Sequence, residues 1–140
     1  MKLLLRVIGT AALLALGAVV MPYSWMNAVH GWLGMGRLPQ APIVSYLARS
    51  TSGFYVLLGG LFWVVSFDLR RHEVVLYYLG VVIVVFGAAL FVIDLAVGMP
   101  LFWSLGEGPF NTALGIVILF SSRRLRAGPS HAYHKLKESE

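Results

Sequence analysis

The stretch VVLYYLGVVIVVFGAALFVIDLAV, residues 74–97, decides the fold class. It contains one charged residue, Asp94, near its end. A helix needs about 20 consecutive, mostly apolar residues to cross the hydrocarbon core of a bilayer. This stretch is long enough, so it predicts a transmembrane helix and an integral membrane protein.

The composition of the whole chain agrees with that prediction. Of its 140 residues, 59% are apolar and 12% are charged, whereas an ordinary soluble domain has roughly 25% charged residues. These values exclude a disordered chain, a coiled coil and an ordinary soluble enzyme domain. The chain has no cysteine, which excludes disulfides, iron–sulfur clusters, thiolate zinc sites and thiol catalysis.

Three further stretches are apolar enough to cross a membrane. With residues 74–97 they predict an all-α, four-helix transmembrane bundle over residues 1–122, with spans at about 3–20, 45–67, 74–97 and 109–122. The second span can extend back to Pro42, since proline suits the first turn of a helix. The fourth is short, and we expect a loop at residues 98–108 before it. Residues 123–140 are expected to form a basic cytoplasmic tail.

Basic residues indicate the orientation of these spans. With four spans both termini lie on one side, and that side holds nine of the eleven basic residues: Lys2, Arg6, Arg70, Arg71, Arg123, Arg124, Arg126, Lys135 and Lys137. Arg37 and Arg49 lie on the other. The positive-inside rule then predicts a multi-pass membrane protein with both termini cytoplasmic. Interfacial aromatics, Tyr23, Trp25, Trp32 and Trp103, would mark the outer surface.

The first span has an alternative interpretation as a cleaved signal peptide. It combines basic residues, an apolar stretch and small residues at Ala15, Gly17 and Ala18. Its apolar run is long for a signal peptide, so an uncleaved anchor is favoured. Cleavage would leave three spans with unchanged orientation.

The sequence contains few residues in patterns that would catalyse a reaction or bind a metal or cofactor. None of the histidines, His30, His72, His131 and His134, lies inside a span, which argues against a haem held between helices. No phosphate loop, nucleophile elbow, zinc-protease helix or di-iron motif occurs. We therefore predict no catalytic residue, no metal and no cofactor. No nucleic-acid partner is expected, because the topology accounts for the basic residues.

One charge inside a span is by default a candidate functional residue. Asp94 lies 21 residues beyond Glu73, about 31 Å along a helix, and Arg49 lies 19 residues before Asp68, about 28 Å along its own. The two residues should reach similar heights near the outer interface. We predict that they form a salt bridge, because either charge alone would be costly there.

Other polar and aromatic residues are expected at the same outer level. They are Glu107, Arg37, His30, Asn111, Trp32, Trp103 and Tyr46. One interpretation is structural, with the charges pinning helices and loops together. The other is a binding site for a quinone, lipid or other small amphipathic ligand. A proton or ion relay is the least favoured.

Small residues predict close helix contacts. They include Ala11 and Ala15 in the first span, Gly59 and Gly60 in the second, and Gly80, Gly87, Ala88 and Ala89 in the third. Packing within the chain is favoured over a dimerisation face. The apolar loop containing Trp25, Met26, Trp32, Leu33 and Met35 is expected to lie on the membrane surface or to cap the bundle.

Three stretches carry a resemblance. HGWLGMGRLP at residues 30–39 and YLARSTSGFY at residues 46–55, with DLAVGMP at residues 94–100, resemble a family of small, uncharacterised four-span proteins of the bacterial inner membrane. In size and layout the chain is also similar to the DoxX-like family, some of whose members are accessory subunits of quinone-linked oxidoreductases. That similarity is architectural, and no functional motif of the family matches residue by residue.

These observations favour a non-enzymatic function. The leading hypothesis is a structural or accessory subunit of a larger membrane complex, with a membrane-protein partner or a second copy of the chain in contact with it. The alternative is a ligand-binding protein acting through the outer polar cluster. An oligomeric channel or transporter comes third, because the spans offer few polar residues to line a pore.

Overall fold

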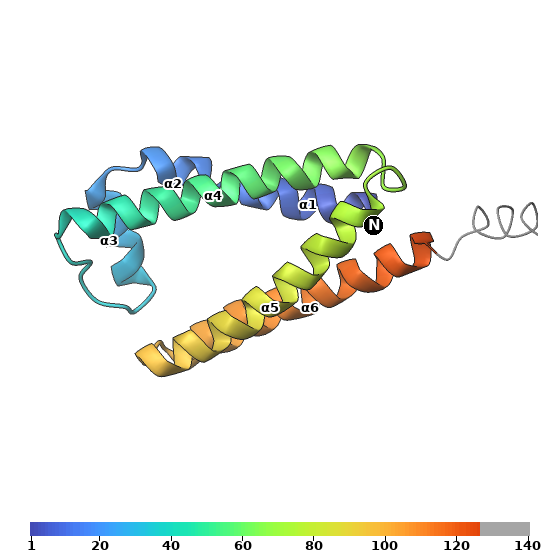
Figure 1. The fold of residues 1–140 in the computed structure, drawn as a ribbon. Helices are drawn as coiled ribbons and strands as arrows, with labels where there is room; N and C mark the ends of the chain where they lie inside the picture. Colours follow the sequence, from blue (N-terminus) through green and yellow to red (C-terminus); the bar gives the residue numbers. More distant parts are fainter. Residues whose placement is uncertain (127–140) are drawn as a thin grey trace, which may run out of the picture. The chain divides into compact units, whose positions relative to one another are not determined.

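The computed structural model of the chain describes residues 1–126, and every regular element in that range is an α-helix. The elements are α1 (Lys2–Leu13), α2 (Leu16–Val20), α3 (Tyr23–Trp32), α4 (Pro42–Phe67), α5 (Glu73–Val97) and α6 (Leu101–Arg126) (Figure 1). The all-helical fold class predicted from the sequence is confirmed.

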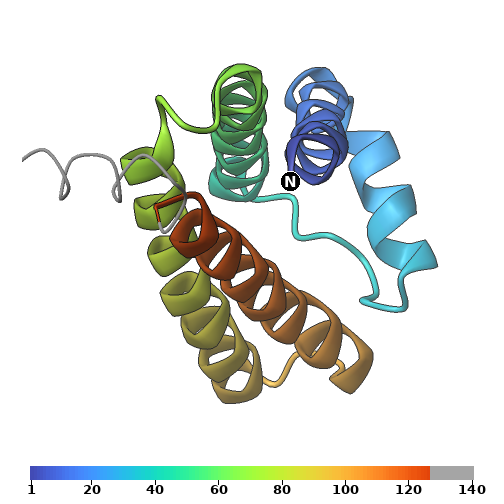
Figure 2. The same ribbon diagram turned by 90° about the vertical axis from the view of Figure 1, so that its right-hand side faces the viewer.

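The helices belong to two compact units, one of residues Lys2–Phe67 and one that begins at Asp68. In the first unit, α1 and α2 run along α4; in the second, α5 runs along α6 (Figures 1 and 2). Each unit is therefore built around one antiparallel helix pair, α1–α4 in the first and α5–α6 in the second. We call each of these pairs a hairpin, although α2 and α3 lie between α1 and α4 in the chain.

Within residues 1–126, three helical stretches are long and apolar enough to cross a membrane. They are Lys2–Val20, Pro42–Phe67 and Glu73–Val97. These match three of the four expected spans, and α4 begins at Pro42 as the proline predicted. The fourth expected span corresponds to α6. This helix is long enough to cross a membrane but is less apolar than the other three stretches, since Glu107, Asn111 and Thr112 interrupt its first half and its last turn contains arginines.

The first of these stretches is not one continuous helix. A turn at Leu14 and Ala15 separates α1 from α2. Here the backbone bonds tighten to an i to i−3 pattern, with Ala15 N donating to the Ala12 carbonyl at 3.1 Å and Ala18 N to the Ala15 carbonyl at 2.9 Å. Gly17 follows directly, and glycine weakens a helix because it has more backbone freedom to lose.

Helix α6 is longer than the span expected at residues 109–122. The loop expected at residues 98–108 is wrong from Leu101 onward, because α6 already begins there. The amides of Trp103 and Ser104 bond to the Pro100 carbonyl at 2.9 and 3.1 Å and so start the helix. At the other end, Arg123 to Arg126 belong to α6 rather than to a tail. The rest of the expected tail, residues 127–140, lies outside the described residues.

Pro109 lies inside α6 instead of at its start. A proline in a helix interior removes one backbone hydrogen bond and costs about 3 kcal/mol or more. The helix continues through it because both sides of Pro109 pack closely against α5, at Gly108 and Thr112.

A glycine turn joins the two helices of the second unit. Gly98 has a φ of 79°, a left-handed conformation that favours glycine. The amides of Gly98 and Met99 bond to the Leu95 and Asp94 carbonyls at 3.3 and 2.9 Å. This cap ends α5 directly after the turn that contains Asp94.

Close contact along four glycines holds α5 against α6. A Cβ atom added to Gly87 would lie 2.6 Å from the Thr112 amide nitrogen, and one added to Gly115 would lie 2.6 Å from that of Val84. The others are Gly80, which faces Leu119, and Gly108, which faces Phe91. Small residues let helix backbones approach closely where lipid supplies no hydrophobic driving force.

The first hairpin has one such contact, between Gly9 of α1 and Gly59 of α4. A Cβ atom added to Gly59 would lie 2.7 Å from the Gly9 carbonyl oxygen, whereas one added to Gly60 would meet nothing within 4 Å. Leu5, Phe62 and Val65 are buried beside it. The predicted packing within the chain is thus confirmed at Gly59, and at Gly80 and Gly87 in the other hairpin, but not at Gly60.

Candidate functional site

The residues of the predicted polar cluster are divided between the two units. His30, Trp32, Arg37, Tyr46 and Arg49 lie in the first unit, and Asp94, Trp103, Glu107 and Asn111 lie in the second. The predicted Arg49–Asp94 salt bridge joins residues of different units, so it stays a prediction.

Asp94 is the most unusual polar residue of the second unit. It lies in the last turn of α5, and only 6% of its surface is exposed. Its Oδ2 atom is buried and has no hydrogen-bond partner among the described residues. A buried polar atom without a partner is costly, and more so in a membrane. Asp94 is therefore a candidate for a polar contact, through its Oδ2 atom, with a group from outside α5 and α6.

Glu107 is held by its own helix. Trp103 Nε1 donates a hydrogen bond of 2.6 Å to Glu107 Oε2, and Asn111 Nδ2 donates one of 2.9 Å to the Glu107 carbonyl. These three residues follow one another at intervals of four, which places them on one face of α6. Phe102, Trp103, Gly106 and Glu107 line an open hollow of about 360 Å³.

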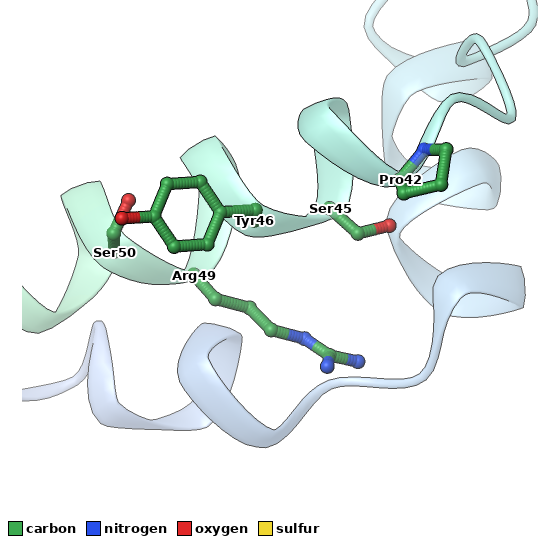
Figure 3. A pocket seen from close by; sticks show the side chains of 5 residues that line it. All are labelled: Pro42, Ser45, Tyr46, Arg49 and Ser50. Carbon is green, nitrogen blue, oxygen red and sulfur yellow. The ribbon is translucent and has the colours of Figure 1, made fainter.

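Arg49 connects two parts of the first unit. Its Nη2 atom donates a hydrogen bond of 3.3 Å to the carbonyl of Met21, the residue that ends α2. Beside it, an open hollow of about 580 Å³ is lined by Pro42, Ser45, Tyr46, Arg49 and Ser50 (Figure 3). Figure 3 shows the Arg49 side chain extended from α4 toward the neighbouring segment.

Three side chains of α3 bind the loop that follows it. The Tyr23 hydroxyl donates to the Leu38 carbonyl, Asn27 Oδ1 accepts a bond of 2.8 Å from the Leu38 amide, and His30 Nδ1 lies 3.0 Å from the Gly36 carbonyl. Gly34 and Gly36 have φ values of 76° and 79°, and these left-handed turns fold the loop back onto α3. His30 is thus bonded to the chain's own backbone. Sequence reasoning did not group these residues, although their i, i+4, i+7 spacing could have shown it.

A second polar group was also missed, at the start of α1. Arg6 Nε donates to Ser66 Oγ at 3.2 Å, and its guanidinium lies 5.4 and 5.7 Å from the ring centres of Trp63 and Phe67. Nearby, Lys2 Nζ donates to the Phe67 carbonyl at 3.3 Å, at the end of α4. The Arg6 guanidinium thus lies over two aromatic rings of α4.

The turn between α4 and α5 begins with Asp68. Its Oδ1 atom accepts hydrogen bonds of 3.1 Å from the amides of both Arg71 and Arg70. The Arg71 amide bond is the main cause that lowers the pKa of this exposed carboxyl below its usual value, and the Arg70 amide and the charge of His72 add to it.

Within residues 1–126, no three His, Asp or Glu side chains gather closely enough to hold a metal ion. His131 and His134 lie outside the described residues. Comparisons of the chain with protein-family models, with curated proteins and with solved structures find no match. The resemblances stated from the sequence accordingly stay predictions.

Proposed function

We propose that the chain is a four-span protein of the bacterial inner membrane that serves as a structural or accessory subunit of a larger membrane complex. The observation that carries this proposal is that most polar side chains of the predicted cluster are bonded to the chain itself. His30, Arg49 and Asn111 bond to backbone carbonyls, and Glu107 bonds to Trp103. Polar groups engaged in this way hold a fold together and leave few free for chemistry.

The fourth span of this proposal is α6. A helix of 26 residues is about 39 Å long, enough to cross the hydrocarbon core. Contacts with α5 extend from Gly80 beside Leu119 to Phe91 beside Gly108. If α5 crosses the membrane, we expect α6 to cross it as well, because the two helices are packed closely together. This holds although α6 is less apolar than α5. The uneven distribution of basic residues supports cytoplasmic termini.

The accessory role is tested by the size of the assembly that holds the chain. In mild detergent, the tagged protein should migrate on a native gel well above a monomeric membrane protein of similar mass, since its own chain contributes only 15.4 kDa. A Glu107→Gln variant should migrate identically, because Glu107 is bonded within α6. Migration of the wild-type protein as a lone chain would contradict the proposal.

One observation favours a second candidate function, the binding of a small amphipathic ligand. Asp94 Oδ2 is buried and has no partner within residues 1–126, and an aromatic-lined hollow beside Trp103 and Glu107 lies on the neighbouring helix of the same unit. Ligand pockets typically combine apolar walls with a few fixed polar groups. A quinone or lipid that copurifies with the wild-type protein and is lost from Asp94→Asn would favour this function.

A further inference from the structure

Helix α3 has two opposite faces of different character. At 100° per residue, Tyr23, Asn27 and His30 lie on one side of the helix, and their side chains are bonded to the loop at Gly36 and Leu38. The polar side chains of this face are therefore engaged with the chain's own loop.

The opposite face of α3 is apolar and uncovered within the first unit. Trp25, Ala28, Val29 and Trp32 occur at i, i+3, i+4 and i+7, the spacing of one helix face. All four are exposed, Trp25 by 65% and Trp32 by 85%. No residue from Tyr23 to Trp32 is an Asp, Glu, Lys or Arg. This face therefore has no charged side chain that could attract a charged partner.

The chain on either side of α3 sets its depth. Only Met21 and Pro22 separate it from α2, the end of the candidate span Lys2–Val20. Arg49 holds this corner through its bond to the Met21 carbonyl. Long basic side chains in a membrane segment place their charge at the lipid–water interface, so the corner at Met21, where α3 begins, belongs at that level.

From these observations we propose that α3 is an in-plane helix whose face of Trp25, Ala28, Val29 and Trp32 is inserted into the boundary between lipid headgroups and acyl chains. Tryptophan is the residue that most favours this boundary, because its ring is apolar and its N–H can be hydrated. The occupant of the face is the bilayer surface. The inference does not depend on the proposed accessory function.

Site-directed spin labelling tests this placement. The chain has no cysteine, so a single label can be placed at Ala28→Cys or Val29→Cys on the apolar face, with both tryptophans left intact. Gln40→Cys, exposed in the segment between α3 and α4, is the matched control. The full-length protein is reconstituted in vesicles of phosphatidylethanolamine and phosphatidylglycerol, and collision rates with oxygen and with a water-soluble nickel chelate are measured.

The proposal expects the labels at Ala28 and Val29 to collide severalfold more with oxygen than with the nickel chelate, and the Gln40 label to show the opposite ratio. Nickel accessibility at Ala28 and Val29 equal to that at Gln40 would place the face in water and overturn the proposal. Low accessibility to both reagents would overturn it as well, since a second copy or a protein partner would then cover the face. Two independent label sites keep the test valid if one variant fails to fold.

Discussion

The two hairpins are held together in different ways. In α5–α6 the backbones touch at four glycines spread over both helices. In α1–α4 they touch at one glycine pair, and side-chain contacts supply the rest: Trp63 Nε1 donates to Thr10 Oγ1 at 3.2 Å, and Arg6 reaches Ser66. Close backbone contact tolerates no added atom, whereas side-chain contacts can be removed one at a time. The difference predicts how each hairpin responds to substitution.

The largest effect is expected in α5–α6. Gly87→Ala places a methyl group 2.6 Å from the Thr112 amide nitrogen, which cannot move without separating the helices. The free energy of unfolding should fall by about 2 kcal/mol, within the range of about 1–3 kcal/mol for overpacked sites. Unfolding of the reconstituted protein by a steric trap measures it.

The control for that substitution is Gly106→Ala in α6, where the added methyl group meets nothing within 4 Å. It should leave stability unchanged or raise it slightly, since alanine favours helix more than glycine does. If both variants lost stability equally, close glycine packing would not be the reason that α5 and α6 adhere.

A smaller loss is expected from Gly59→Ala in the first hairpin. The added methyl group would lie 2.7 Å from the Gly9 carbonyl oxygen and 3.0 Å from the Leu13 amide nitrogen, but this is the one close glycine pair between α1 and α4, and α1 ends at Leu13. The loss should be about 1.5 kcal/mol, again from overpacking. Gly60→Ala is the neighbouring control, with no contact to disturb. An equal response of Gly59→Ala and Gly87→Ala would remove the proposed difference between the hairpins.

The side-chain contacts of α1–α4 should each contribute less. Trp63→Phe removes the hydrogen bond to Thr10 and should lower the free energy of unfolding by about 1 kcal/mol, the usual net value of one hydrogen bond. Combining it with Thr10→Val in a double-mutant cycle isolates the pair. A coupling energy near zero would show that the Trp63–Thr10 bond does not stabilise the hairpin.

The smallest effect concerns the exposed turn at Asp68. Because its pKa is lowered in the folded protein, its contribution to stability is complete above the pKa of the unfolded chain and is lost as the pH falls through the folded value. Unfolding measured from pH 6 down to pH 3 should show a slightly steeper loss in the wild-type protein than in Asp68→Asn. Identical slopes would mean that the amide bonds of Arg70 and Arg71 do not favour the charged carboxylate.

Hydropathy alone predicted the helical class and three of the spans, because long apolar runs with few charges have no stable alternative in a bilayer. Residues 74–97 match α5 to within one residue. The extent of α6 was missed, since Gly106, Gly108 and Pro109 usually indicate a loop, and only packing against α5 explains the helix there. The break after Leu13 was missed as well, because hydropathy carries no information on backbone hydrogen bonds.

The candidate site was less predictable than the fold. The sequence identified Asp94 as unusual, and the structure shows it buried, with no hydrogen-bond partner for Oδ2 in the part of the chain that is described. The sequence could not show that His30 bonds to the Gly36 carbonyl or that Glu107 bonds to Trp103, because such local contacts depend on where turns and helices begin. The i, i+4 spacing of Trp103 and Glu107 indicates that they share a helix face, but it does not show the hydrogen bond between them.

We propose that the polar groups of this chain serve its fold and that the chain acts within a larger assembly. Intact-complex mass spectrometry of the full-length protein, extracted in discs of native membrane, tests it most directly. We expect the chain in fixed stoichiometry with a larger membrane protein, and the same stoichiometry for Glu107→Gln. A lone chain carrying one defined small molecule, lost in Asp94→Asn, would contradict it and make Asp94 the centre of a binding site.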